Sequence, residues 1–199
     1  MSGTSILRVV VSALLVCSCG GADKASKETP AQASPQEIAR QQQEADRIVK
    51  EQMGKVQQRE AATFPCRVFT QSDIESIAGN PLERGNYMFN NVTEDTHTFK
   101  SESCDWSARG SGNEVALWVS QPAHFQSGHV ECAPGMGKEE SATAGDRAWW
   151  DYKKSFGMGT LRVCSSKAML EVRVIVTDKD EATAKRIAQR TSEKVLASL

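Results

Sequence analysis

An export signal at the N-terminus determines which residues of this chain remain to fold and in which compartment they fold. Arg8 is the only charge before an apolar run over residues 9–16, and small residues follow from Ser18 onward. The run is too short to span a bilayer as a helix. We therefore expect residues 1–18 to be a signal peptide, and the remainder to be exported into an oxidising compartment.

Residues 15–20, Leu-Val-Cys-Ser-Cys-Gly, resemble the bacterial lipoprotein signal. In that signal an apolar residue lies three positions before the modified cysteine and a small residue lies just before it. Cys19 fits because Val16 and Ser18 occupy those positions, although leucine is commoner than valine; Cys17 directly follows the branched Val16. The resemblance implies a diacylglyceryl group and an acyl chain such as palmitate on Cys19, which together anchor a protein stably. A secreted protein cleaved near Ser18 is the alternative.

Two polar segments follow the signal. Residues 19–35 contain Gly, Ala, Ser, Pro and charged residues with no apolar group to bury, so we expect a flexible tether. Residues 36–62 are rich in helix formers, and Ser34 with Glu37 supplies a capping motif, which predicts a helix. Its apolar stripe is narrow and interrupted by glutamine. We interpret it as a solvated stalk, with a dimer-forming or domain-docked helix as alternatives.

Residues 64–199 are expected to form one globular domain with a helix near each end. Ser72 with Glu75 has the spacing of a capping box and predicts a short first helix. Asp178 with Glu181 has the same spacing and predicts a closing helix with one apolar side.

The middle of this domain has the pattern of an antiparallel sheet. Apolar residues alternate over 87–89, 104–106 and 115–119, which predicts strands. Residues 161–163 and 170–176 predict a further hairpin with one buried face. The fold class is therefore α+β, a meandering antiparallel sheet with helices packed on one face.

The cysteines beyond the signal predict two disulfides. There are four of them: Cys66, Cys104, Cys132 and Cys164. An even count in an exported protein favours disulfides, of which three connectivities are possible. We favour Cys66–Cys104 and Cys132–Cys164, because each pair joins neighbouring elements in chain order. A zinc site is the alternative, but the chain has no CxxC or CxxH spacing among them.

Several short motifs in residues 64–199 resemble a known group of proteins. They are Cys-Asp-Trp-Ser at 104–107, Gly-Asp-Arg-Ala-Trp at 145–149, the hairpin through Cys164 and an Ala-rich terminal helix. Their order is similar to that in small bacterial envelope lipoproteins of unknown function best represented in actinobacteria. The resemblance implies an α+β domain anchored in the cell envelope, and it implies no reaction.

No motif predicts catalysis, a metal or a cofactor. The three histidines lack the spacing of zinc ligands, and the Gly-Met-Gly-Lys turn at 135–138 lacks the first glycine and the hydroxyl of a phosphate loop. The formal net charge of −1, from 24 basic and 25 acidic residues, leaves no basic surface for nucleic acid. We expect a protein that is not an enzyme.

One aromatic segment is a candidate binding surface, formed by Trp149, Trp150, Tyr152 and Lys153. If the segment is a strand, Trp149 faces one side and Trp150 with Tyr152 the other, so both tryptophans cannot enter one core. An exposed aromatic side would suit a protein interface or stacking on a sugar ring. Burial of both rings, one in the core and one under a helix or loop, is the alternative.

These features predict a lipoprotein of the bacterial cell envelope, held on the periplasmic or extracytoplasmic face of a membrane by lipid on Cys19. Its leading predicted function is binding of an envelope protein, in an accessory or immunity-type role. A binding module for cell-wall glycan or a small ligand is the alternative, and an enzyme comes third.

Overall fold

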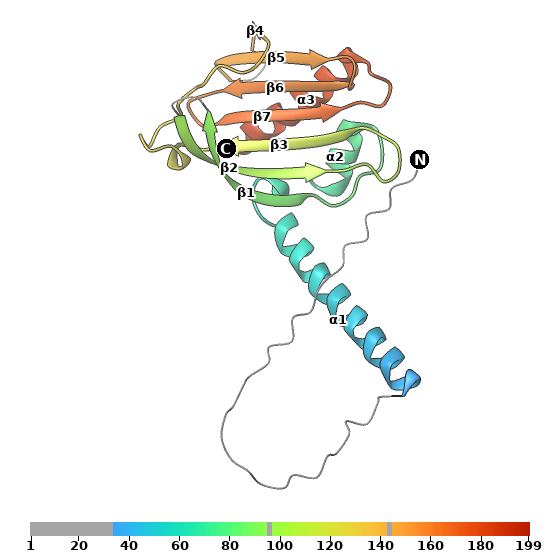
Figure 1. Ribbon diagram of the computed structural model, residues 1–199. Coiled ribbons are helices and arrows are strands. Elements are labelled where there is room, and N and C mark those ends of the chain that lie inside the picture. The colour runs from blue at the N-terminus through green and yellow to red at the C-terminus, as the bar shows by residue number, and fades with distance from the viewer. Residues whose placement is uncertain (1–33, 95–96, 143–144) are drawn as a thin grey trace, which may run out of the picture. The chain divides into compact units, whose positions relative to one another are not determined.

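The alternating apolar residues form one sheet in the computed structural model, which describes residues 34–94, 97–142 and 145–199 (Figure 1). The helices and strands are, in chain order, α1 (Pro35–Ala61), η1 (Cys66–Val68), α2 (Gln71–Ala78), β1 (Asn86–Glu94), β2 (His97–Trp106), β3 (Glu114–Ser120), η2 (Pro122–His124), β4 (Lys138–Glu140), β5 (Arg147–Lys153), β6 (Met158–Cys164), β7 (Met169–Ile175) and α3 (Glu181–Ser198).

The seven strands have the order β1-β2-β3-β7-β6-β5-β4, and every neighbouring pair is antiparallel. The predicted α+β class is confirmed. The sheet consists of two meanders, β1 to β3 and β4 to β7, which meet where β3 pairs with β7. Two of its strands, β1 and β4, therefore lie at its edges.

Helices α2 and α3 and the main core lie on one face of the sheet, which we call the helix face (Figure 1). Because side chains alternate along a strand, Leu117, Val172 and Leu161 all point to this face and are buried. Helix α3 packs on β6 and β7, and its buried residues are Ala184, Ile187, Ala188, Thr191, Ser192 and Val195.

The other face, which we call the open face, carries no α-helix of residues 64–199. The segment 121–137 covers one end of it and builds a second, smaller apolar cluster there. Phe125 stacks on Phe99 with ring centroids 5.4 Å apart, and Trp149, Cys164 and Met169 complete the cluster.

Both helices of the domain begin at different caps from those predicted. Helix α2 is capped by Thr70 with Asp73, two residues before the expected pair, and Gly79 in a left-handed conformation ends it. The predicted cap residue Glu75 instead accepts the Leu82 N–H. Helix α3 is capped by Asp180, because the expected cap residue lies in the preceding turn.

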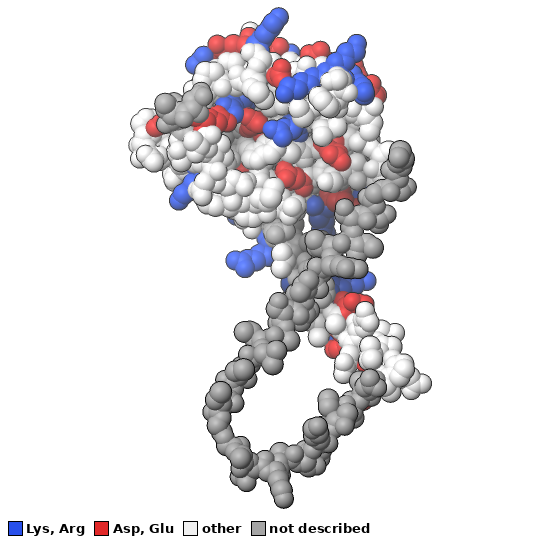
Figure 2. Space-filling model, viewed as in Figure 1, with Lys and Arg blue, Asp and Glu red and all other residues white. Residues whose placement is uncertain are grey.

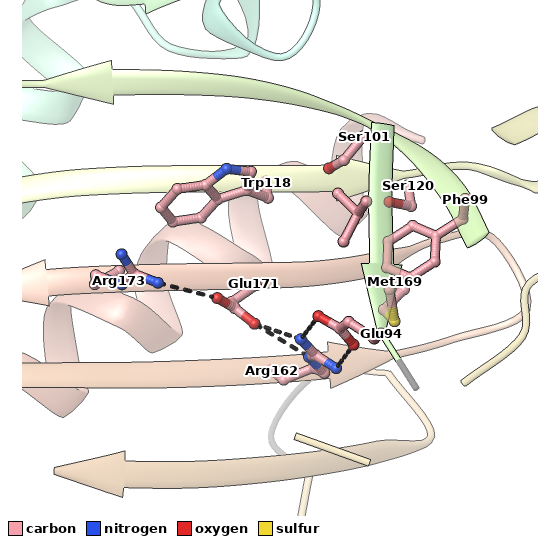
Figure 3. A pocket seen from close by; sticks show the side chains of 10 residues that line it. Glu94, Phe99, Ser101, Trp118, Ser120, Arg162, Met169, Glu171 and Arg173 are labelled. Atoms are coloured by element: carbon pink, nitrogen blue, oxygen red, sulfur yellow. Dashed lines mark hydrogen bonds and ion pairs between the residues drawn. The ribbon is translucent and has the colours of Figure 1, made fainter. Parts of the chain in front are cut away.

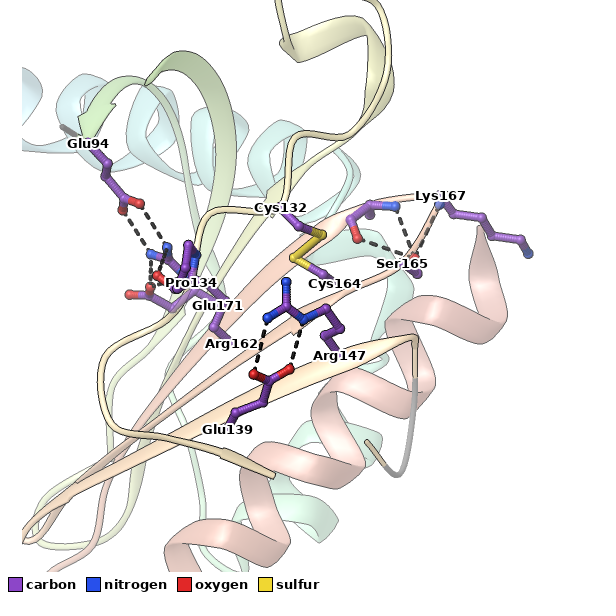
Figure 4. Close-up of a disulfide and its surroundings, with 11 residues drawn as sticks. Glu94, Cys132, Pro134, Glu139, Arg147, Arg162, Cys164, Ser165, Lys167 and Glu171 are labelled. Carbon is purple, nitrogen blue, oxygen red and sulfur yellow. Dashed lines mark hydrogen bonds and ion pairs between the residues drawn. A yellow bond between two sulfur atoms is a disulfide. The ribbon is translucent and has the colours of Figure 1, made fainter. Parts of the chain in front are cut away.

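The predicted disulfides, Cys66–Cys104 and Cys132–Cys164, are both present. They lie on opposite sides of the sheet: Cys104 belongs to the helix-face core and Cys164 to the smaller open-face cluster. Figure 4 shows the second disulfide, which attaches the segment 121–137 to β6. Their sequence separations of 38 and 32 correspond to about 4 kcal/mol of stabilisation each in the chain-entropy treatment.

Helix α1 matches the helix predicted for residues 36–62, with the predicted reciprocal cap between Ser34 and Glu37. Every α1 side chain that is described is exposed, including Ile38, Ile48 and Val49. The chain divides into two units, residues 1–42 and 43–199. The predicted signal peptide, the predicted lipidation site Cys19 and nearly all of the predicted tether lie outside the described residues.

Candidate ligand-binding groove

The part of the open face that segment 121–137 leaves uncovered carries two rows of mostly charged and polar side chains. Strand register aligns Asp105, Ala116 and Arg173 in one row across β2, β3 and β7. The adjacent row contains Ser103, Trp118, Glu171 and Arg162 on β2, β3, β7 and β6. Figure 2 shows acidic and basic side chains interspersed on this side of the molecule.

Arg162 anchors the second row. It is only 8% exposed and donates five hydrogen bonds: two to Glu94 at 2.8 Å, two to Glu171 at 2.6 and 3.2 Å, and one to the Pro134 carbonyl at 3.3 Å. Burial disfavours its charge, but the hydrogen bonds to Glu94 and Glu171 raise the pKa of Arg162 overall. Since its donors are engaged by protein acceptors, we assign it a structural role (Figures 3 and 4).

Two hollows adjoin Trp118 on the open face. The first, about 220 Å³, combines apolar walls from Val92, Phe99 and Met169 with polar groups such as Ser101 (Figure 3). The second, about 290 Å³, lies over Ala116 between Asp105 and Arg173. Trp118 and Arg173 line both hollows, so we treat them together as one groove. Each hollow is smaller than a typical drug-sized pocket, which suits a small molecule.

Two charged groups of the groove have unused hydrogen-bonding capacity. Asp105 Oδ1 and Arg173 Nε are buried and have no hydrogen-bond partner within the described parts of the chain. Arg173 has one ion pair, at 3.6 Å from Nη2 to Glu171, and its Cζ lies 4.9 Å from the centre of the Trp118 ring. Such unpaired buried groups cost about 1 to 3 kcal/mol each, so their presence calls for a partner.

Ala116 explains why Asp105 and Arg173 do not satisfy each other. Their strands flank β3, which places their Cα atoms about 10 Å apart at ordinary strand spacing. The Ala116 methyl between them leaves the hollow unfilled. Desolvation raises the pKa of Asp105, and the Arg173 charge offsets only part of that rise. A carboxylate and a guanidinium thus line one small hollow.

The two tryptophans of the candidate aromatic segment are buried, as the packing alternative expected. Trp149 and Trp150 are 4% and 6% exposed, and they enter the two different clusters that alternation requires. Trp150 donates to Glu181 at 2.9 Å, and Tyr152 stacks on it with centroids 6.4 Å apart. Lys153 is exposed beside them. The segment 121–137 and helix α3 cover the two faces, so packing explains both tryptophans.

The described histidines do not form a metal site. His124 accepts the Gln121 N–H at 3.1 Å and lies 3.8 Å from Glu102, whereas His129 contacts its own turn. Within the described ranges, no group of three or more His, Cys, Asp or Glu side chains is arranged to hold a metal ion.

Comparison with known proteins identifies no relative: no family model, curated protein or solved structure matches the chain. In the part of the chain that the structure describes, no helix combines the length and the apolar character needed to cross a membrane. What the structure itself defines is an α+β domain with a polar groove on the helix-free face of its sheet.

The residues of this groove were not predicted, although the sequence contained a signal for them. In the strand 115–119 the apolar residues Val115, Leu117 and Val119 alternate with others that include Trp118. A tryptophan on the polar side of an amphipathic strand is a reason to expect a binding surface. The position of Asp105 opposite Arg173 depends on the β3–β7 pairing, which the sequence pattern did not indicate.

Proposed function

We propose that the domain is a non-enzymatic binding module of the cell envelope, and that its groove binds a small zwitterionic molecule. The observation that carries this proposal is a pair of residues of opposite charge, Asp105 and Arg173, which line one hollow on either side of Ala116 and each retain an unpaired polar atom. A ligand with an ammonium group and a carboxylate satisfies both at once. Amino acids and the termini of short peptides have this chemistry.

Each group of the groove has a separate task in this proposal. The guanidinium of Arg173 binds the carboxylate through charge-assisted hydrogen bonds, and Asp105 accepts from the ammonium group. Trp118 holds Arg173 in place by the cation–π contact and supplies an apolar wall for a side chain. The hydrogen-bonded cluster around Arg162 holds neighbouring strands together, and the guanidinium of Arg162 is occupied by Glu94 and Glu171.

The same features support a binding role rather than catalysis. The four cysteines of the domain are in disulfides, which removes a thiolate nucleophile. The carboxylates beside Arg162 are hydrogen-bonded to it. Lipid on Cys19 and the exposed helix α1 would present the groove at the membrane surface, in agreement with the N-terminal signal.

The test is calorimetric binding of alanyl-alanine to the full-length chain in detergent. We expect binding of the dipeptide and its loss when either the amino group is acetylated or the carboxylate is amidated. Arg173→Gln should weaken binding about 10- to 100-fold, the value of one charge-assisted contact. Arg109→Gln is the matched control, because Arg109 makes a comparable 3.7 Å ion pair with Glu83 outside the groove.

Absence of dipeptide binding, or equal binding of the blocked forms, would refute a zwitterion site. N-acetylglucosamine serves as the neutral comparison: if it binds and the dipeptide does not, the groove recognises glycan instead. Binding of an envelope protein in an accessory or immunity-type role is the second candidate function. Because the tryptophans of the aromatic segment are buried, they cannot form the surface for such a partner. The candidate surface for a protein partner is the exposed edge strand β1.

A further inference from the structure

The two edges of the sheet differ in how well they are protected against pairing with another strand. Edge strands of natural proteins are commonly short or charged, since their free N–H and C=O groups can otherwise pair with another chain. Strand β4 fits this rule, because it has three residues, Lys138–Glu140, and all of them are charged. This edge needs no partner.

Strand β1 at the other edge does not follow the rule. It runs for nine residues, Asn86–Glu94, without Pro, Lys or Arg. Its one charge, Glu94, is already neutralised by two hydrogen bonds from Arg162. Met88 and Phe89 are large apolar residues of this strand, and they are 40% and 50% exposed. The strand is a long, nearly uncharged template for strand addition.

The sequence of β1 complements itself when two copies run antiparallel around Asn90. In that register Met88 of one chain lies beside Val92 of the other, an apolar pair on the open face. Asn86 lies beside Glu94, and no like charges meet. Asn90 faces its own copy on the two-fold axis. The edge therefore provides the isologous contact that a symmetric dimer requires.

We propose that two copies of this protein pair through β1 and form one continuous antiparallel sheet. A two-fold axis perpendicular to the sheet keeps the open faces of both copies on the same side. Both Trp118 grooves then face the same direction. The inference is independent of the ligand proposed for the groove, and it takes from the proposed function only the membrane anchor.

A strand edge alone buries less than the roughly 800 Å² per partner of a standard interface, so the free dimer is expected to be weak. Confinement to a membrane raises the effective concentration of one chain beside another. The dimer should therefore be measured with the full-length protein in its native envelope and in liposomes at high protein density.

Cysteine crosslinking tests the register. Paired residues of antiparallel strands have Cα atoms about 4.5 to 5.5 Å apart, within the range that a disulfide spans. In envelopes treated with a mild oxidant, Asn90→Cys alone should give a covalent dimer. Met88→Cys alone should not, since the two copies of residue 88 lie about 14 Å apart along the strands. A tagged Met88→Cys chain mixed with a Val92→Cys chain should crosslink.

Mass spectrometry of the native disulfides Cys66–Cys104 and Cys132–Cys164 verifies that each variant is folded. If neither the Asn90→Cys chain nor the Met88→Cys and Val92→Cys mixture forms dimers, the proposal is wrong. Crosslinking of Asn90→Cys to a different protein would overturn the self-pairing and assign the edge to the second candidate function. Equal dimer yields from all single-cysteine variants would indicate random collision and would also reject the register.

Discussion

Arg162 gives the sharpest prediction about stability, because it joins two carboxylates from distant parts of the chain. Replacement by methionine keeps the apolar stem and removes the guanidinium. The substitution deletes all five hydrogen bonds, leaves the Glu94 carboxylate without its cation and leaves Glu171 with only its 3.6 Å ion pair to Arg173. Removing one partner of a buried ion pair costs about 3 to 5 kcal/mol.

The exposure of the partners sets the expected value within that range. Glu94 is 34% exposed and Glu171 20%, so water recovers part of the loss. We therefore expect Arg162→Met to lower the free energy of unfolding by about 3 kcal/mol. Arg147→Met is the matched control: Arg147 also pairs with a glutamate, Glu139, but both side chains are about half exposed. Its loss should be below about 1 kcal/mol.

Urea unfolding of the disulfide-intact protein, followed by tryptophan fluorescence and circular dichroism, measures both values. Equal losses for Arg162→Met and Arg147→Met would show that the buried cluster contributes no more than a surface ion pair. That result would refute the structural role given to Arg162, and with it the view that its charge is unavailable to a ligand.

Three further predictions concern Asp105, Asp73 and the Cys132–Cys164 disulfide. Because burial raises the pKa of Asp105, its charged form opposes folding at neutral pH, and this cost disappears as the pH falls through the raised pKa. Asp105→Asn should therefore stabilise the free protein by about 1 kcal/mol in urea unfolding at pH 7. The same substitution should abolish dipeptide binding. Hydrogen bonds from Lys194 and the helix cap lower the pKa of Asp73 from 3.8 to about 2. Its stabilisation is present above pH 4 and is lost as the pH falls toward 2, so the thermal midpoint of Asp73→Asn should depend less on pH in that window. Replacing Cys132 and Cys164 by serine should cost about 4 kcal/mol in unfolding free energy and expose residues 121–137 to protease; an unchanged digestion pattern would contradict the role of this disulfide.

The sequence predicted the elements whose signals are local. Alternation and capping residues located the helices and most strands. The pairing of Cys66 with Cys104 was predicted from the chain order of neighbouring elements, and the structure contains this disulfide. The errors at the caps are also local: Ser72 and Thr70 both have an acidic residue three positions later, and the sequence could not rank them. The Lys194 ion pair with Asp73 favours the earlier cap and is visible only in the fold.

The groove could not be predicted because it depends on long-range register. Asp105 and Arg173 are 68 positions apart in sequence, and their alignment requires β3 to pair with β7. The aromatic segment shows the opposite case. Its residues are adjacent and conspicuous in the sequence, but strand alternation sends Trp149 and Trp150 into two different apolar clusters.

Nuclear magnetic resonance of the tryptophan side chains tests the groove most directly. Trp118 lines both hollows, whereas Trp149 and Trp150 are buried away from them. Titration of the ¹⁵N-labelled full-length protein with alanyl-alanine should shift the Trp118 indole and the Arg173 Nε–H signals in a saturable manner. The indole signals of Trp149 and Trp150 should stay in place. Saturable shifts at those two tryptophans, or none at Trp118, would contradict a zwitterion site on the open face.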